Sequence, residues 1–159
     1  MATASTPDLS PLLKLWPLLL LLAAIGAVKL ALWWREERRI ARSGIEQVDA
    51  MDGITFERFL AALFSKLGYR VERTRARGDY GADLVVERDG ERMVVQAKRW
   101  SKKVGVKAVQ EANAAPAMYS CSRALVVTNS RFTPQAKELA RANRVELWDR
   151  DVLIDRMLA

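Results

Sequence analysis

The sequence predicts an α/β fold, in which a mixed sheet is flanked by helices and preceded by one transmembrane helix. Three observations predict it. From residue 53 to residue 158, the apolar pattern changes repeatedly between helical spacing and short apolar runs. Asp89-Gly90 joins two β-branched runs, which is a strong hairpin signal. A long apolar segment precedes both. The chain has 159 residues, enough for one globular domain and a small additional segment.

Residues 15–34 are expected to span a membrane. They carry a single charge, Lys29, and a helix of about 20 residues is about 30 Å long, which matches a bilayer core. Tryptophans stand at both ends of the segment, where indole rings favour the headgroup layers. Lys14 is the only basic residue before the segment, whereas arginines 35, 38, 39 and 42 follow it. The positive-inside rule therefore places the C-terminal part in the cytoplasm, at the cell inner (cytoplasmic) membrane.

This interpretation divides the chain into four parts. They are an N-terminal tail (1–14), the transmembrane helix (15–34), a basic juxtamembrane linker with a break at Gly44 (35–50) and a soluble domain (51–159). The alternative for the linker is a continuation of the helix. The alternatives for the apolar segment are a cleaved signal peptide and a buried helix of a soluble protein. A signal peptide is disfavoured because MATASTPDLS contains no Lys or Arg and the apolar run is long.

The soluble domain is expected to begin with a helix over residues 53–67. Apolar residues recur there at helical spacing, and Gly68 follows where a helix often ends. An alternating strand over 69–74, a glycine-rich loop and the Asp89-Gly90 hairpin come next. The remaining elements are a helix over 104–119 that Pro116 kinks or shortens, a strand over 123–128, a helix over 134–143 with Thr133 as N-cap, a strand over 145–148 and a helix over 151–158.

The hairpin has one register that its side chains support. With Asp89 and Gly90 as the turn, the residue numbers of each pair of opposite residues add up to 179. In this register, opposite charges face each other and apolar residues face each other. A slip of one residue would place Glu87 opposite Glu91, which is unfavourable. The supported register sets Asp83 opposite Gln96 at a Cβ separation of roughly 5 Å.

Three polar residues therefore converge on one face of the hairpin. Gln96 and Lys98 project from the same side of their strand, toward Asp83. A carboxylate and an amide oxygen suit Mg²⁺ or Mn²⁺, and a nearby ammonium can position a water and balance charge on a phosphate. The alternative is an ordinary ion pair between Asp83 and Lys98 on an open face.

The composition excludes several other chemistries. The chain contains no histidine, which removes Ser-His-Asp and Cys-His nucleophile systems and nearly all zinc sites. The single cysteine, Cys121, cannot form an internal disulfide. Any catalysis must use carboxylates, amides, lysines or a metal held by oxygen, and no small-molecule cofactor is expected.

The stretch GDYGADLVVERDGERMVVQAKRW resembles the Mrr-like branch of the PD-(D/E)XK nucleases, in which an aspartate on one hairpin strand faces a (D/E/Q)-x-K motif on the next. The likeness continues in GITFERFLAALFSKLGYRVERT, VGVKAVQE and ALVVTNSRFTPQAKELA, over about residues 52–150. It implies a restriction-endonuclease-like fold for 51–159. It also implies a Mg²⁺-dependent DNA endonuclease of the restriction type (type IV) or repair type, acting on modified or branched DNA, with Mn²⁺ as an alternative metal.

The resemblance also implies roles for individual residues. Asp83 and Gln96 would ligate the metal together with the Ala97 carbonyl, and Lys98 would be the catalytic lysine. Glu57 would complete the catalytic metal site, although the helix dipole also favours a glutamate near a helix start. Two departures stand out: Ala82 replaces a proline of the family pattern, and Gln96 replaces the commoner acid, as is usual in the Mrr-like branch. In the loop before the hairpin, Asp79 is either a substitute ligand or a turn-stabilising residue.

Basic residues flank the motif on both sides. One run contains Trp100 among Lys98, Arg99, Lys102, Lys103 and Lys107, and another contains Arg70, Arg73, Arg75 and Arg77. With a formal charge of +7, these runs indicate an anionic partner. We expect Arg99, Lys102, Lys103 and Lys107 to contact DNA, together with Gln110, which falls where the family carries a helix glutamine. A solvated charged face is the alternative.

Three alternative functions remain open from sequence. The domain can be a catalytically weak module that tethers DNA to the membrane, or a domain whose basic runs bind anionic lipid. RNA cleavage is also open, because the chemistry does not distinguish the sugar. A homodimer is the simplest way to cut both strands of a duplex, so self-association is a further expectation.

Overall fold

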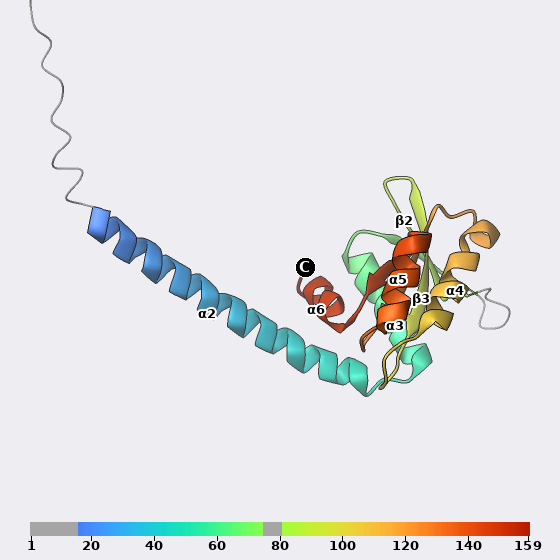
Figure 1. Cartoon of the computed structure of the whole chain (residues 1–159), viewed down its shortest axis with the longest axis horizontal. Coiled ribbons are helices and arrows are strands. Elements are labelled where there is room, and N and C mark those ends of the chain that lie inside the picture. Colours follow the sequence, from blue (N-terminus) through green and yellow to red (C-terminus); the bar gives the residue numbers. More distant parts are fainter. Residues whose placement is uncertain (1–15, 75–80) are drawn as a thin grey trace, which may run out of the picture. The chain divides into compact units, whose positions relative to one another are not determined.

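The computed structural model describes residues 16–74 and 81–159, with side chains omitted over 33–43. The chain divides into two compact units, Met1–Arg39 and Ile40–Ala159. The second unit contains all five strands described, with helices on both sides of the sheet (Figure 1).

Helix α2 (Trp16–Asp49) is continuous, so the expected break at Gly44 is wrong. Ile45 and Val48 are buried in the core of the second unit, so the end of the segment expected as a linker packs as part of this unit. A Cβ placed on Gly44 would lie only 3.1 Å from the Met157 side chain in α6 (Arg150–Leu158). The glycine therefore permits a close approach between two helices.

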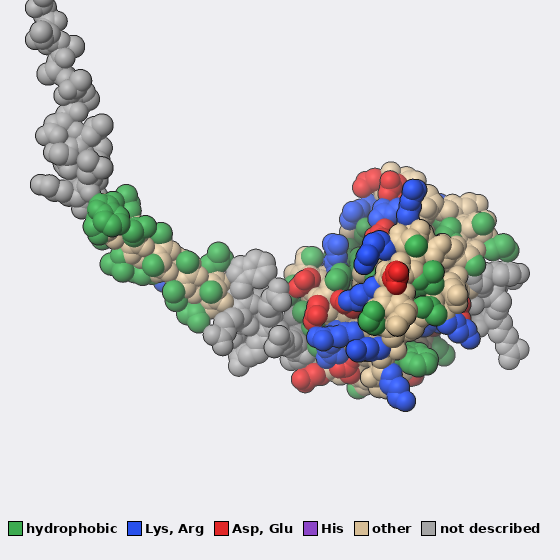
Figure 2. Space-filling model, in the orientation of Figure 1, with side chains coloured by type: hydrophobic (Ala, Val, Ile, Leu, Met, Phe, Trp, Pro, Cys, Tyr) green, Lys and Arg blue, Asp and Glu red, His purple; other side chains and the backbone are tan. Residues whose placement is uncertain are grey.

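Large apolar side chains are exposed along α2 from Trp16 to Leu32 (Figure 2). Within the part of the chain that the structure describes, however, no helix has the length and the apolar character needed to cross a membrane. The expected membrane span at 15–34 is therefore not supported. Residue 15 and the side chains of residues 33 and 34 lie outside the part that the structure describes.

The sheet is mixed, as expected, and its strands follow one another in chain order. The first three strands are antiparallel: β1 (Arg70–Arg73), β2 (Leu84–Arg88) and β3 (Glu91–Lys98). The last two run parallel to β3: β4 (Arg123–Thr128) and β5 (Glu146–Trp148). The carboxyl ends of β3, β4 and β5 thus share one edge with the start of β2.

The hairpin register is confirmed. Leu84 pairs with Val95, and Arg88 pairs with Glu91. Asp89 and Gly90 both have positive φ, at 56° and 81°, as the type I′ turn requires. The amide of Asp83 donates to the Val95 carbonyl at 2.9 Å, so the pairing continues one residue beyond β2.

The two faces of the sheet are covered by different helices. One face packs against the end of α2, α3 (Gly53–Lys66) and α6, and the other packs against α4 (Val106–Ala114) and α5 (Pro134–Asn143). The second face carries Val85, Val94 and Gln96, and Gln96 is only 5% exposed. The alternative of an ordinary ion pair between Asp83 and Lys98 requires this face to be open to solvent. Helix α4 covers it instead.

Local signals set the ends of the helices. Asp52 caps α3 by accepting from the Thr55 amide at 2.7 Å, and Thr133 caps α5 as expected. The helix expected over 104–119 is shorter, because Pro116 ends the α-helical part and begins a 3₁₀ turn, η1 (Pro116–Tyr119).

Candidate active site

Asp83 and Gln96 form the centre of the candidate site. The Gln96 Nε2 atom donates to Asp83 Oδ2 at 2.6 Å, and the Ala97 amide donates to the same oxygen at 2.7 Å. The hydroxyl of Thr74, just beyond β1, donates to the Asp83 carbonyl at 3.0 Å and to the Ala82 carbonyl at 2.5 Å. The aspartate is therefore fixed both through its carboxylate and through its backbone.

The amide of Gln96 is held in one orientation. Since its Nε2 atom donates to Asp83, its Oε1 atom points elsewhere, and this oxygen is buried with no hydrogen-bond partner among the described residues. Leaving a buried amide oxygen unsatisfied costs roughly 1–3 kcal/mol. An uncompensated oxygen of this kind is well suited to a ligand.

Lys98 contacts an acid that the sequence analysis did not single out. Its Nζ atom lies 2.8 Å from Glu111 Oε2 on α4, with 25% of the lysine side chain and 32% of the glutamate side chain exposed. Lys107 lies 3.9 Å from the other oxygen of Glu111. The (i, i+4) spacing of Lys107 and Glu111 was visible in the sequence, but the contact of Glu111 with Lys98 depends on how α4 packs on β3.

Gly81 brings the loop before Asp83 against α4 at this same glutamate. Its φ is +83°, and a Cβ placed on it would fall 2.7 Å from the carbonyl carbon of Glu111. No real side chain tolerates such a contact without movement of the backbone. Gly81 thus fixes the distance between Asp83, which immediately precedes β2, and the helix that carries Glu111.

The other expected site residues are distributed around this centre. Glu57 is half-buried on α3, which packs on the opposite face of the sheet from Gln96, and its part in a metal site stays a prediction. The described residues include no cluster of three His, Cys, Asp or Glu side chains able to hold a metal ion. Gln110 is exposed on α4, whereas its neighbour Glu111 reaches Lys98. Asp79, Arg75 and Arg77 lie outside the described residues.

The expected DNA-contacting residues remain accessible to a partner. Lys102, Lys103 and Lys107 are exposed, and Arg99 is half-buried with its Nε donating to the Met51 carbonyl. Arg99, Lys102 and Lys103 follow the carboxyl end of β3, and Lys107 lies on α4, 3.9 Å from the glutamate that contacts Lys98. Their role in DNA binding stays a prediction.

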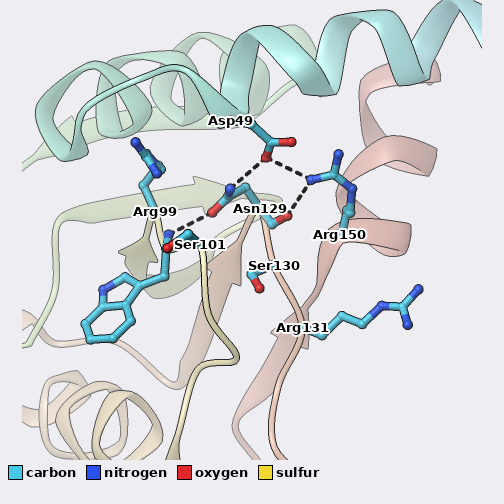
Figure 3. A pocket seen from close by; sticks show the side chains of 8 residues that line it. Asp49, Arg99, Ser101, Asn129, Ser130, Arg131 and Arg150 are labelled. Carbon is cyan, nitrogen blue, oxygen red and sulfur yellow. Dashed lines mark hydrogen bonds and ion pairs between the residues drawn. The ribbon is translucent and has the colours of Figure 1, made fainter.

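A polar network adjoins this edge (Figure 3). Asp49, the last residue of α2, accepts from Asn129 Nδ2 at 2.7 Å and from Arg150 at 2.8 Å. Arg150 also donates to the Asn129 carbonyl at 2.9 Å, and Asn129 Oδ1 accepts from the Trp100 amide at 2.8 Å. The hydrogen bond from Arg150 and that from Asn129 lower the pKa of Asp49, while Asp49 raises the pKa of Arg150.

This network predicts a pH-dependent contribution to stability. Because the pKa of Asp49 is lowered in the folded state, its contribution is fully present above the unfolded pKa and is lost as the pH falls through the folded pKa. The free energy of unfolding should exceed that of Asp49→Asn by a constant amount above about pH 5, and by less below about pH 4. Urea unfolding of both proteins from pH 7 to pH 3 measures this, and a difference that does not change with pH would contradict it.

The fold and the hairpin define a nuclease domain of the restriction-endonuclease type. Residues 48–157 match the family model of the Mrr catalytic domain, described as a restriction endonuclease. The chain belongs to this family.

Comparisons with individual proteins agree with this assignment. The chain is 31% identical over 111 residues to the type IV methyl-directed restriction enzyme EcoKMrr of Escherichia coli (strain K12), covering 65% of this chain and 36% of that enzyme. The chain thus spans little more than a third of this relative. Its fold is similar to the DNA modification-dependent restriction endonuclease AspBHI (TM-score 0.56, 20% identity, 77% of this chain and 35% of that one). It is also similar to the MspJI restriction endonuclease, solved with a 27-mer oligonucleotide (TM-score 0.51, 18% identity, 77% and 31%).

Proposed function

We propose that this chain is a metal-dependent endonuclease that hydrolyses phosphodiester bonds in DNA, of the restriction or repair type. The observation that carries the proposal is the hydrogen-bonded pair of Asp83 and the buried Gln96, with Lys98 following on the same strand face. The family supports cleavage of nucleic acid. Because EcoKMrr is methyl-directed and AspBHI is modification-dependent, modified DNA is the substrate we favour.

The donor set of the site fits a hard divalent cation. Asp83 offers a carboxylate, Gln96 offers an amide oxygen without a described partner, and the Ala97 carbonyl lies between Gln96 and Lys98. Mg²⁺ takes oxygen ligands and keeps several waters, so it does not require a complete protein cage. We propose that these residues hold Mg²⁺, or Mn²⁺ in its place. A bound ion would polarise the scissile phosphate and make a coordinated water more acidic.

The residues around the metal site have separate roles in the proposed reaction. Asp83 and Gln96 present the oxygen atoms that would hold the divalent ion, and hydrogen bonds within the hairpin keep both side chains in place. Lys98 orients the attacking water and balances negative charge on the phosphate. Glu111 is a positioning residue that holds the Lys98 ammonium beside the hairpin at 2.8 Å. The closed face under Gln96 keeps bulk water away from the amide.

Cleavage of supercoiled plasmid by the full chain tests this function. We expect nicking with Mg²⁺, no nicking with excess chelator, and faster cleavage of methylated than of unmethylated plasmid. The ratio of nicked to linear product reports whether two copies act together on both strands, as the expected homodimer would. Metal-independent binding without any cleavage would instead support the DNA-tethering module.

We further propose that the chain associates with the cytoplasmic membrane, with the second unit in the cytoplasm. The exposed apolar side chains of α2 between Trp16 and Leu32 support this. The full chain should sediment with membranes and be released by detergent, whereas a chain beginning at Ile40 should stay in the supernatant. Recovery of the full chain in the supernatant would contradict the proposal.

A further inference from the structure

A pocket of about 510 Å³ opens at the carboxyl ends of the parallel strands (Figure 3). Its charged and hydroxyl groups come from three segments that follow β3, β4 and β5, and from the end of α2. They are Arg99, Ser101, Ser130, Arg131, Arg150 and Asp49. The edge formed by the carboxyl ends of parallel strands is where open α/β sheets bind their ligands.

The pocket directly adjoins the candidate active site. Lys98 pairs with Thr128 in the sheet, and the next residues on the two strands, Arg99 and Asn129, line the pocket. Trp100 follows Lys98 by two residues, a reach of at most about 7 Å, which is within one or two nucleotide steps along DNA. A polynucleotide lying across Lys98 would therefore pass over the pocket.

The charge of the pocket favours an anion. Its one carboxylate, Asp49, is neutralised by Arg150 at 2.8 Å and also accepts from Asn129. This leaves the positive charges of Arg99 and Arg131 in excess. Arg131 lies 3.8 Å from Asp151, but its side chain is 65% exposed, so this pair is weak and the guanidinium can turn to a ligand.

The floor of the pocket is built before any ligand arrives. Asn129 is 4% exposed, and its side chain joins Asp49 to the amide of Trp100. The Arg150 amide donates to the Ser130 carbonyl at 2.8 Å, which ties α6 to the loop after β4. Such a network fixes the segments relative to one another, so binding requires little ordering of the backbone.

The exposed side chain of Trp100 favours a nucleic acid over a free anion. Its side chain is 54% exposed, and it lines both this pocket and the adjoining one that contains Lys98 and Glu111. An inorganic phosphate has no surface for an exposed indole, whereas a nucleotide presents the face of a sugar or base next to its phosphate. The tryptophan thus joins the two pockets along the path of one strand.

We propose that this pocket binds a DNA backbone phosphate one or two nucleotides from the scissile phosphate, through Arg99, Arg131 and Ser130, with Trp100 against the adjoining nucleoside. The choice of DNA rests on the proposed function. The pocket sets the register of the strand, so that the phosphate to be cut lies at Asp83 and Lys98.

The test measures DNA binding separately from cleavage. A labelled duplex of about 20 base pairs is titrated with the full chain in chelator, at several salt concentrations, for wild type, Arg131→Gln and Trp100→Ala. Arg141→Gln is the matched control, because Arg141 is an exposed arginine in the last turn of α5, away from the pocket. Thermal unfolding of each protein checks that the fold is retained.

We expect Arg131→Gln to weaken binding about tenfold and to reduce the salt dependence by about one phosphate contact. Trp100→Ala should also weaken binding, and Arg141→Gln should stay within about twofold of wild type. Equal affinity of Arg131→Gln and Arg141→Gln would overturn the proposal, as would binding by wild type to phosphatidylserine vesicles but not to the duplex.

The outcomes separate this proposal from the proposed function. If wild type cuts plasmid with Mg²⁺ and Arg131→Gln binds DNA as tightly as wild type, the nuclease function is supported and the phosphate pocket is contradicted. If Arg131→Gln binds DNA more weakly but wild type cuts no DNA, the pocket is supported and the nuclease function is contradicted.

Discussion

The Asp83→Asn variant is expected to lose plasmid cleavage by a factor on the order of 10³ while keeping its fold and its affinity for DNA in chelator. The substitution keeps the shape of the side chain but removes the negative charge that would hold a divalent ion. It also weakens the two hydrogen bonds that the Gln96 side chain and the Ala97 amide donate to this carboxylate. Single-turnover cleavage with Mg²⁺ measures the effect.

The same hairpin supplies a matched control. Asp89→Asn makes the same chemical change in the exposed turn, at a residue with φ 56°, a conformation that asparagine adopts readily. This control should cut as fast as wild type. Equal activity of Asp83→Asn and Asp89→Asn would show that Asp83 does not take part in the reaction.

The second large effect is expected at Gly81. Gly81→Ala forces a Cβ against the backbone of Glu111, at a residue whose φ of +83° also disfavours any side chain. Together, the strain and the overlap should lower the free energy of unfolding by about 2–4 kcal/mol. Because the loop must move away from α4, Asp83 should separate from the Lys98–Glu111 pair, and cleavage should fall further than stability alone explains.

Gly90→Ala separates the backbone strain of a positive φ from the steric overlap with Glu111. Gly90 has φ +81°, but a Cβ there meets nothing within 4 Å. It should therefore show the conformational cost alone, about 1 kcal/mol, with normal cleavage. Chemical denaturation and cleavage of both variants make the comparison, and equal losses of stability at Gly81 and Gly90 would refute the role of the contact with Glu111.

Much of the fold was predictable because its signals are local. The turn chemistry of Asp89-Gly90 fixes the hairpin register, and that register alone brings Asp83 to Gln96. Thr133 and Pro134 likewise mark the start of α5 as the structure has it. These features depend on residues close together in the chain, so a periodic pattern and a turn motif suffice to find them.

The parts that were missed depend on tertiary packing. Glu111 reaches Lys98 only because α4 lies across the face of the sheet that holds Gln96, and no local pattern reports that crossing. Gly44 was expected to end a helix, since glycine is a poor helix former, yet packing of Ile45 and Val48 in the core outweighs this preference. The network of Asp49, Asn129 and Arg150 joins residues up to 101 positions apart, beyond the reach of sequence spacing.

The last turn of α2 has a fixed rotational phase. Ile45 and Val48 are buried on one side of it, and Asp49 bonds to Asn129 and Arg150. One residue inserted between Ile45 and Asp49 would turn the preceding helix by about 100° and move either the apolar pair or the carboxylate out of place. The same insertion before Gly44 leaves all these contacts in phase. The final turn of α2 is therefore held to a single spacing by the edge of the sheet that it meets.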